Sequence, residues 1–258
     1  MAPTNFSTVT EVTGNRVTQD QLERLYQRYT FAAQFCDGMD VLEVACGAGQ
    51  GLGYLAKKAK LVVGGDYTEN LLRVAQRYYS GRVPLLHLDA HALPFRDSSF
   101  DVVLLYEAIY YLSNPEHFLD ECRRVLRENG MLLLCTVNKE WSDFNRSPFS
   151  TRYFSARELS KLLRKHGFRV DLRGAFPVNK DSANDHVMSF LKRLAVAFHL
   201  IPRTMKGKEL LKRLFLGSLS PLPSEVHEGM GCYTPPVAIS GTDVCPRFKI
   251  LFVLAYLS

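Results

Sequence analysis

A glycine-rich turn within residues 41–56 carries the residue types and spacing best suited to chemistry. Residues 41–45 are apolar apart from Glu43, which predicts a short buried strand. Gly47 and Gly49 then predict a tight turn, and a helical pattern resumes directly after it. A glycine-rich strand-to-helix turn lets the backbone approach a ligand closely and points free N–H groups at it. The sequence therefore predicts a site for a nucleotide cofactor here.

The spacing of the glycines excludes the dinucleotide-binding pattern G-x-G-x-x-G. Leu52 stands where a third glycine would follow Gly47 and Gly49, and Tyr54 stands where one would follow Gly49 and Gly51. The turn has instead an acid inside the strand and a small residue at every second position. These residues are Glu43, Ala45, Gly47 and Gly49.

Two more acids close the next predicted strands. Residues 61–65 predict a second strand that ends at Asp66, where a carboxylate can accept hydrogen bonds from both hydroxyls of a ribose. Residues 83–88 predict a third strand, which Asp89 closes. A surface turn remains the alternative explanation for Asp66.

These segments, taken in order, resemble the motifs of the class I S-adenosylmethionine-dependent methyltransferases, in the type 11 branch that acts on small molecules such as quinone precursors. The glycine turn resembles the first motif of that family, with Ala45 where many members have glycine. Residues 89–101 resemble the family stretch DA-x-x-LPF…FD, and residues 107–112 resemble its EVLEHL run. Tyr111 replaces the family histidine that faces the methyl acceptor, so a histidine mechanism is not expected. The resemblance covers about residues 28–176 and the last strand.

The resemblance implies S-adenosylmethionine as the cofactor and S-adenosylhomocysteine as the product. It implies that Asp66 binds the ribose, that Asp89 accepts the adenine amino group, and that the backbone N–H of Ala90 reaches a ring nitrogen. For catalysis we expect Tyr111 to orient the acceptor and Glu107 to place the cofactor or take a proton, or both to act only as pocket walls. The implied cofactor-binding residues are Tyr29, Ala45, Gly47, Gly49, Asp66, Tyr67, Asp89, Ala90 and Tyr106.

Predicted strands and helices alternate along the chain, which indicates an α/β fold with a mostly parallel, Rossmann-like sheet covered by helices on both faces. The resemblance adds that the sheet has seven strands and an antiparallel last strand. We expect one domain whose core is residues 38–176 and 247–258, preceded by a helix over residues 18–36 that covers the cofactor. Residues 177–246 are predicted to form an insertion between strands six and seven that covers the acceptor site.

The net charge of +6 is concentrated in one segment. Residues 189–216 contain seven basic residues and one acid, so the rest of the chain is close to neutral, which argues against nucleic acid as a partner. Apolar residues alternate with the basic ones, as in a helical cap or in helices that lie on an anionic membrane. We favour the cap; peripheral membrane contact would suit a lipid, quinone or lipid-linked sugar acceptor.

Cysteine usage and hydropathy indicate a cytoplasmic protein without a metal site. The six cysteines include no C-x-x-C pair and no histidine at zinc spacing, which predicts reduced thiols and leaves a bridge between Cys232 and Cys245 open. Residues 1–16 are polar, and no apolar run is long enough to span a membrane. The oligomeric state, the acceptor and the acceptor atom stay open. The alternative function is a non-catalytic protein that binds S-adenosylmethionine.

Overall fold

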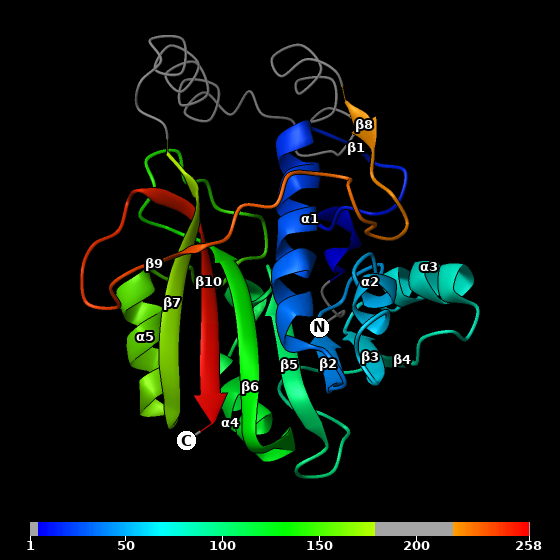
Figure 1. Cartoon of the computed structure of the whole chain (residues 1–258), viewed down its shortest axis with the longest axis horizontal. Coiled ribbons are helices and arrows are strands. Elements are labelled where there is room, and N and C mark those ends of the chain that lie inside the picture. The colour runs from blue at the N-terminus through cyan, green and yellow to red at the C-terminus, as the bar shows by residue number, and fades with distance from the viewer. Residues whose placement is uncertain (1–4, 179–218, 258) are drawn as a thin grey trace.

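An eight-stranded sheet organises the chain in the computed structural model, which describes residues 5–178 and 219–257 (Figure 1). The strand order is β4-β3-β2-β5-β6-β10-β7-β9. Neighbouring strands from β4 to β6 are parallel, whereas β10 lies antiparallel between β6 and β7. The strands are β2 (Asp40–Val44), β3 (Leu61–Asp66), β4 (Leu85–His87), β5 (Phe100–Tyr106), β6 (Leu126–Val137), β7 (Phe168–Pro177), β9 (Val237–Ala238) and β10 (Phe248–Leu257).

The predicted fold class and the antiparallel last strand are confirmed, but the sheet has one strand more than the seven expected. The extra strand is β9, which pairs over two residues with the edge strand β7. A strand of two residues is too short to show an alternating pattern of apolar and polar side chains, so β9 was not predictable.

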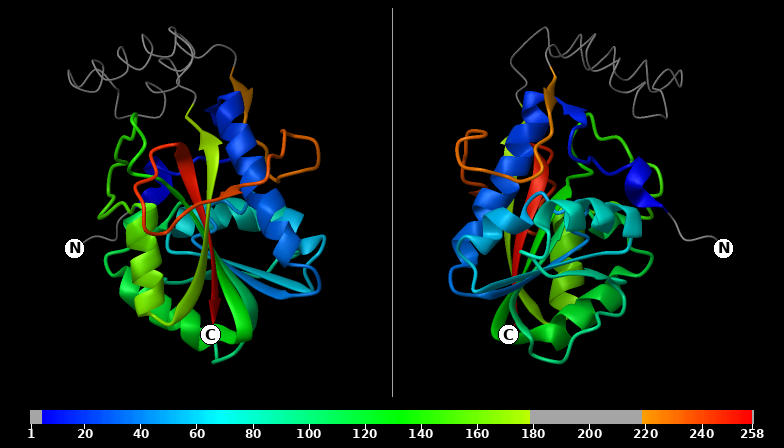
Figure 2. Two further views of the ribbon diagram at one scale, coloured as in Figure 1. Left: turned by 60° about the vertical axis from the view of Figure 1, so that its left-hand side comes forward. Right: turned by 90° about the vertical axis from the view of Figure 1, so that its right-hand side faces the viewer.

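Helices cover both faces of the sheet (Figure 2). Side chains of α1, α2 and α3 join one buried cluster, and side chains of α4 and α5 join the other. In β2 this division follows the alternation of side chains along a strand, since Val41 belongs to the first cluster while Leu42 and Val44 belong to the second. The helices are α1 (Gln19–Ala32), α2 (Leu52–Ala56), α3 (Glu69–Tyr79), α4 (Pro115–Val125) and α5 (Ala156–Lys165), with 3-10 turns η1 (Phe6–Thr8), η2 (Ala33–Phe35) and η3 (Ile109–Tyr111).

Side-chain caps fix where the long helices begin. Thr18 forms a capping box at the start of α1, and Ser155 forms another at the start of α5. Asn114 accepts hydrogen bonds from two backbone N–H groups of α4, whose first residue is Pro115. The predicted starts of these helices are therefore confirmed. Tyr29 of α1 contacts Glu43 of β2 and Tyr106 of β5, so α1 lies beside the carboxyl ends of these strands.

The described part of the segment predicted as an insertion, residues 219–246, lies along α1, α2 and β7. Its first strand, β8 (Ser220–Pro221), pairs with β1 (Arg16–Val17) beside α1. Further on, Glu228 accepts hydrogen bonds from Tyr26 of α1 at 2.9 Å and from Tyr54 of α2 at 2.7 Å. The predicted basic helices and the predicted membrane-contacting segment, residues 189–216, lie outside the described residues.

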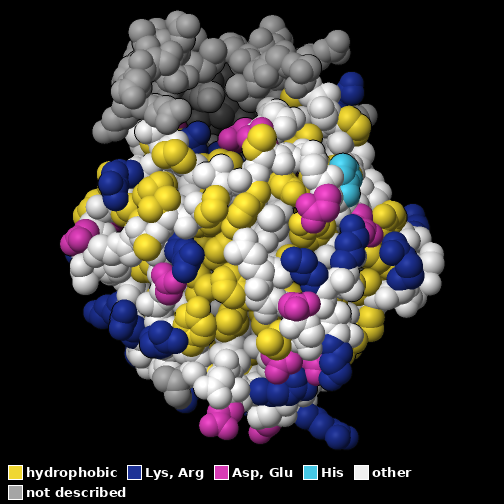
Figure 3. All heavy atoms as spheres, in the orientation of Figure 1, with side chains coloured by type: hydrophobic (Ala, Val, Ile, Leu, Met, Phe, Trp, Pro, Cys, Tyr) yellow, Lys and Arg dark blue, Asp and Glu magenta, His cyan; other side chains and the backbone are white. Residues whose placement is uncertain are grey.

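Surface charge and thiol chemistry are unexceptional in the part of the chain that the structure describes. Lys and Arg side chains are interspersed with Asp and Glu on the face shown in Figure 3. All six cysteines are free thiols, so Cys232 and Cys245 are not bridged. Among the described residues, no cluster of three metal-ligating side chains occurs, and no helix is long and apolar enough to cross a membrane.

Candidate functional site

A cavity of about 690 Å³ lies at the carboxyl edge of the parallel strands. The residues that directly follow β2, β3, β4 and β5 all line it, together with residues of α1 and the N-terminal residues Phe6, Val9, Thr10 and Glu11. This is the edge where doubly wound sheets bind ligands, and the volume falls within the range of about 300–1,000 Å³ for small-molecule sites. The sequence-predicted residues that line it are Tyr29, Ala45, Gly47, Asp66, Tyr67, Asp89, Ala90, Tyr106, Glu107 and Tyr111.

Gly49 is the one predicted cofactor residue that does not line the cavity. A Cβ atom at Gly49 would lie 3.0 Å from the ring of Tyr79 and 3.1 Å from Ala75 of α3. The Tyr79 hydroxyl donates to the Gly49 carbonyl at 2.6 Å and accepts from the Gly53 N–H at 2.9 Å. The missing side chain therefore leaves room for helix α3, and the role of Gly49 in cofactor binding stays a prediction.

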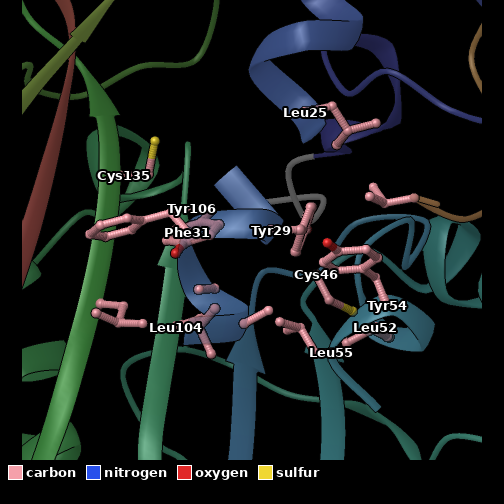
Figure 4. Close-up of a cluster of buried hydrophobic side chains, with 14 of the residues drawn as sticks. Leu25, Tyr29, Phe31, Cys46, Leu52, Tyr54, Leu55, Leu104, Tyr106 and Cys135 are labelled. Carbon is pink, nitrogen blue, oxygen red and sulfur yellow. The ribbon is translucent and has the colours of Figure 1, made fainter. Parts of the chain in front are cut away.

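Gly51 allows Tyr29 of α1 to lie against the turn. A Cβ atom at Gly51 would lie only 1.7 Å from a carbon of the Tyr29 ring. The Tyr29 hydroxyl donates to Glu43 at 2.6 Å, and Figure 4 shows Tyr29 between α1 and Cys46. The other carboxylate oxygen of Glu43 is buried without a partner among the described residues. Burial raises the pKa of Glu43 to about 7, because a charged carboxylate is poorly solvated there.

Asp66 holds the glycine turn in its conformation. One carboxylate oxygen accepts from the Gly47 N–H at 2.8 Å, and the other accepts from the Thr68 N–H at 2.7 Å. Burial raises the Asp66 pKa despite these bonds. Each carboxylate oxygen has two lone pairs, so this arrangement leaves capacity for hydroxyl donors from the cavity. The role of Asp66 as a ribose acceptor stays a prediction.

Asp89, which follows β4, is connected through His91 to Asn114 at the start of α4. One oxygen of Asp89 accepts from the backbone N–H of His91 at 2.8 Å and bonds to its Nδ1 at 2.6 Å, while Nε2 of His91 accepts from the Asn114 N–H at 3.2 Å. The pKa of Asp89 is lowered from its usual value. Partial burial alone would raise this pKa, but the hydrogen bonds and the charge of His91 outweigh that effect. His91 also lines the cavity.

Glu107 lies half-buried after β5 in a backbone conformation that is uncommon outside glycine. Its φ angle is 52°, and its N–H donates to the Cys135 carbonyl at 2.8 Å. Its carboxylate accepts from the Tyr110 hydroxyl at 3.1 Å. Burial raises the pKa of Glu107, although the charge of Arg28 on α1 opposes the effect. Strained backbone is concentrated at functional sites, so this geometry supports Glu107 as a functional residue.

Comparison with known proteins identifies the family. A family model described as a methyltransferase domain matches residues 42–134. A relative from Mycolicibacterium smegmatis, named "Probable S-adenosylmethionine-dependent methyltransferase", is 40% identical over 60% of each chain. Phthiotriol/phenolphthiotriol dimycocerosates methyltransferase 1 of Mycobacterium ulcerans is 32% identical over 79% of this chain and 70% of its own length. The chain belongs to the class I S-adenosylmethionine-dependent methyltransferases.

Solved structures of this methyltransferase family share the fold. An S-adenosylmethionine-dependent methyltransferase from Thermotoga maritima superposes with a TM-score of 0.59 and 19% identity, over 92% of each chain. At that identity the likeness shows the fold alone. The alignments with the first three curated relatives span 60–64% of the lengths of those relatives.

The methyltransferase cavity fits S-adenosylmethionine, the cofactor of the family. The cofactor carries a sulfonium and an ammonium group against one carboxylate, so its net charge is positive. Five acidic side chains line the cavity against one arginine, an excess that favours a cation. In addition, Nε of Arg28 and Oε2 of Glu43 are buried without partners among the described residues, and buried polar groups ordinarily find one. The acids are Glu11, Glu43, Asp66, Asp89 and Glu107.

Three residues of the cavity, Arg28, Phe6 and Phe149, were not predicted from the sequence. Arg28 had a usable signal, because a basic residue stands between Leu25 and Tyr29 on the helix predicted to cover the cofactor. Phe6 and Phe149 had none, since each is an isolated phenylalanine in a polar stretch. Only the folded chain brings these residues beside Tyr111.

Proposed function

We propose that the protein transfers a methyl group from S-adenosylmethionine to a hydroxyl group of a small molecule. One observation carries this proposal: a single cavity joins the predicted cofactor residues to Glu107 and the aromatic residues beyond it. A donor and an acceptor bound in one cavity react as a positioned pair, which removes much of the entropic barrier of a reaction between two free molecules.

The cofactor end supplies groups of matching charge and hydrogen-bonding type. We propose that Glu43 faces the ammonium group, that Arg28 faces the carboxylate, and that Asp66 accepts the ribose hydroxyls. Asp89 and the Ala90 N–H would hold the adenine, with the half-exposed ring of Tyr67 beside it; Tyr67 is 41% exposed. When bound, S-adenosylmethionine supplies an activated methyl group on a positively charged sulfur.

Glu107 is the proposed proton acceptor. The acceptor oxygen loses its proton as it gains the methyl group, and the Glu107 carboxylate takes that proton. Burial raises the Glu107 pKa, which makes this carboxylate a stronger base than one in water. Tyr110 donates to one carboxylate oxygen and so orients the group. The Tyr111 hydroxyl lies 2.6 Å from Ser147 Oγ and is held by this hydrogen bond. A hydroxyl held in this way fits the expected role of orienting the acceptor better than a role in proton transfer.

The relatives support a small-molecule acceptor. The Mycobacterium ulcerans relative is named for phthiotriol and phenolphthiotriol dimycocerosates, which are small molecules rather than proteins or nucleic acids. The interspersed surface charge in Figure 3 agrees with this, because it forms no basic stripe on that face. A variant of this proposal has the acceptor at a membrane surface, as a lipid, a quinone or a lipid-linked sugar. The basic residues of segment 189–216 favour this variant.

The test is methyl transfer from labelled S-adenosylmethionine to components of a metabolite and lipid extract, followed by mass spectrometry. We expect labelled product together with S-adenosylhomocysteine. Glu107→Gln keeps the size and the bond to Tyr110, so it should lower kcat by about 10²–10⁴, the usual contribution of a general base, and leave binding of S-adenosylhomocysteine unchanged.

The matched control is Glu128→Gln, at an exposed acid on β6 far along the strand from the cavity. It should keep full activity. Cofactor binding without any labelled product from any extract would instead support the non-catalytic alternative. Full activity in Glu107→Gln would show that positioning alone accounts for turnover.

A further inference from the structure

We propose that Phe6, Tyr111 and Phe149 form an acceptor subsite that binds the uncharged, apolar part of the methyl acceptor. The inference rests on the proposed function and adds the chemical class of the acceptor. These three residues are called the aromatic trio below. They come from the N-terminal turn η1, from η3 after β5, and from the loop before α5, and all three line the cavity.

Phe6 contacts both other rings of the aromatic trio, and further rings continue toward Glu107. The Phe6 centroid lies 5.1 Å from that of Tyr111 and 6.3 Å from that of Phe149. Tyr111 in turn lies 4.6 Å from Tyr110, whose hydroxyl bonds to Glu107. A continuous aromatic wall therefore runs from the exposed ring of Phe149 to the proposed proton acceptor.

The charge distribution assigns this end of the cavity to an uncharged ligand. The lining residues among 6–9, 110–113 and 149–151 include no charged side chain, whereas five acids line the cavity as a whole. An ionic group placed against aromatic and aliphatic walls would lose its hydration without gaining a partner. An apolar group would instead gain the free energy of leaving water.

Phe149 has two features that packing alone does not explain. Its side chain is 54% exposed although it is a large apolar ring. Its φ angle is 66°, in the left-handed region that bulky residues rarely adopt. Both features are unfavourable for stability. The ring nevertheless lies at the cavity wall, which is expected for a residue that binds a ligand.

Hydrogen bonds fix the Phe149 loop to the segment that carries Glu107. Thr151 donates from its N–H to the Tyr110 carbonyl at 2.8 Å, and from its hydroxyl to the Leu112 carbonyl at 2.8 Å. On the other side of Phe149, the Ser147 N–H donates to the Tyr153 hydroxyl at 3.0 Å. The loop and the Glu107–Leu112 segment are thus one unit, so a ligand bound by the trio has a defined position relative to Glu107.

The test measures binding of 1-naphthol, an uncharged ring alcohol, and of 4-hydroxynaphthalene-1-sulfonate, its charged counterpart, to the protein saturated with S-adenosylhomocysteine. We expect 1-naphthol to bind at least tenfold more tightly than the sulfonate. Phe149→Ala and Phe6→Ala should each weaken 1-naphthol binding by five- to tenfold and leave the affinity for S-adenosylhomocysteine unchanged. Tyr78→Ala is the matched control, since Tyr78 is a partly exposed ring on α3 that does not line the cavity.

The outcomes separate this inference from the proposed function. Absent binding of 1-naphthol, equal binding of the sulfonate, or unchanged 1-naphthol affinity in both alanine variants would overturn the subsite while S-adenosylhomocysteine still binds. Failure of S-adenosylhomocysteine to bind the wild-type protein would overturn the proposed function itself. Phe149 is largely exposed, so Phe149→Ala should fold, and an unchanged melting temperature checks this.

Discussion

The two ends of the cavity are built in different ways. At the cofactor end, main-chain groups of the glycine turn are held by buried side chains: Asp66 accepts from the Gly47 N–H, and Tyr79 bonds to Gly49 and Gly53. At the aromatic end, rings on three separate segments contact one another and one of them is half exposed. Backbone geometry thus defines the first end and side-chain identity defines the second, so the second can change without altering the fold.

The cofactor end depends on glycine for a reason that the comparison makes clear. Successive glycines of the turn each admit a side chain from another element. Tyr79 of α3 lies at Gly49, Tyr29 of α1 lies at Gly51, and Glu225 lies at Gly53. The aromatic end has no such dependence, because its rings meet side chain to side chain.

Gly51→Ala should have the largest effect of the substitutions considered. The new Cβ would lie 1.7 Å from the Tyr29 ring, so Tyr29 must leave its place and lose its bond to Glu43. Displacement of a buried aromatic ring costs about 3–5 kcal/mol of unfolding free energy. We expect a loss of that size in urea denaturation and no measurable calorimetric binding of S-adenosylhomocysteine.

Gly231→Ala is the control for this substitution. A Cβ at Gly231 would make only ordinary contacts, at 3.4 Å, with Glu23 and Tyr26. Both of these residues belong to α1, the helix that also carries Tyr29. Gly231→Ala should keep both stability and cofactor binding. If Gly51→Ala binds S-adenosylhomocysteine as tightly as the wild type, Tyr29 does not belong to the cofactor end. The cofactor end would then depend less on its glycines than proposed.

The second prediction concerns the pH dependence of the cofactor end. Burial raises the pKa of Glu43 to about 7 from an ordinary value of 4.5. Between these values the folded state keeps a proton that the unfolded state has released, so the unfolding free energy falls as pH rises and levels off above pH 7. The total fall is roughly 3 kcal/mol, at 1.36 kcal/mol per pKa unit.

Urea denaturation of the cofactor-free protein between pH 5 and 8 measures this effect. The wild type should lose stability relative to Glu43→Gln as pH rises, whereas Glu128→Gln should follow the wild-type curve. Parallel curves for the wild type and Glu43→Gln would show that Glu43 is ionised throughout, and that its unpaired oxygen finds solvent.

The same contrast explains what the sequence predicted and what it did not. The alternation of strands and helices, the glycine spacing and the acids after successive strands are local in sequence. They predicted the mostly parallel sheet and placed Asp66, Asp89 and Glu107 at the edge where the cavity lies. Tyr111 was predicted, but its contact with Phe6 and the place of Phe149 beside them were not, because these residues meet only through tertiary packing. The packing of α3 against Gly49 was not predicted either, since a turn pattern does not show which element packs behind it.

The smallest expected effect tests whether the cofactor end holds strain that glycine would relieve. Ala45 lines the cavity with a φ angle of 58°, a conformation that glycine adopts without strain. A left-handed conformation costs an L-residue about 1–2 kcal/mol, and glycine loses about 0.5–1 kcal/mol more conformational free energy on folding, so Ala45→Gly should stabilise the protein by about 0.5–1 kcal/mol. Thermal denaturation should show a rise of a few degrees.

Ser98→Gly provides the comparison for Ala45→Gly, because Ser98 has a similar φ angle of 53° and does not line the cavity. Equal gains in both variants would show that relief of backbone strain is the whole effect. A smaller gain at Ala45 together with weaker S-adenosylhomocysteine binding would show instead that the Ala45 methyl group contacts the cofactor. In that case side-chain identity would matter at both ends of the cavity, and alanine at this position would be selected for binding in spite of its strain.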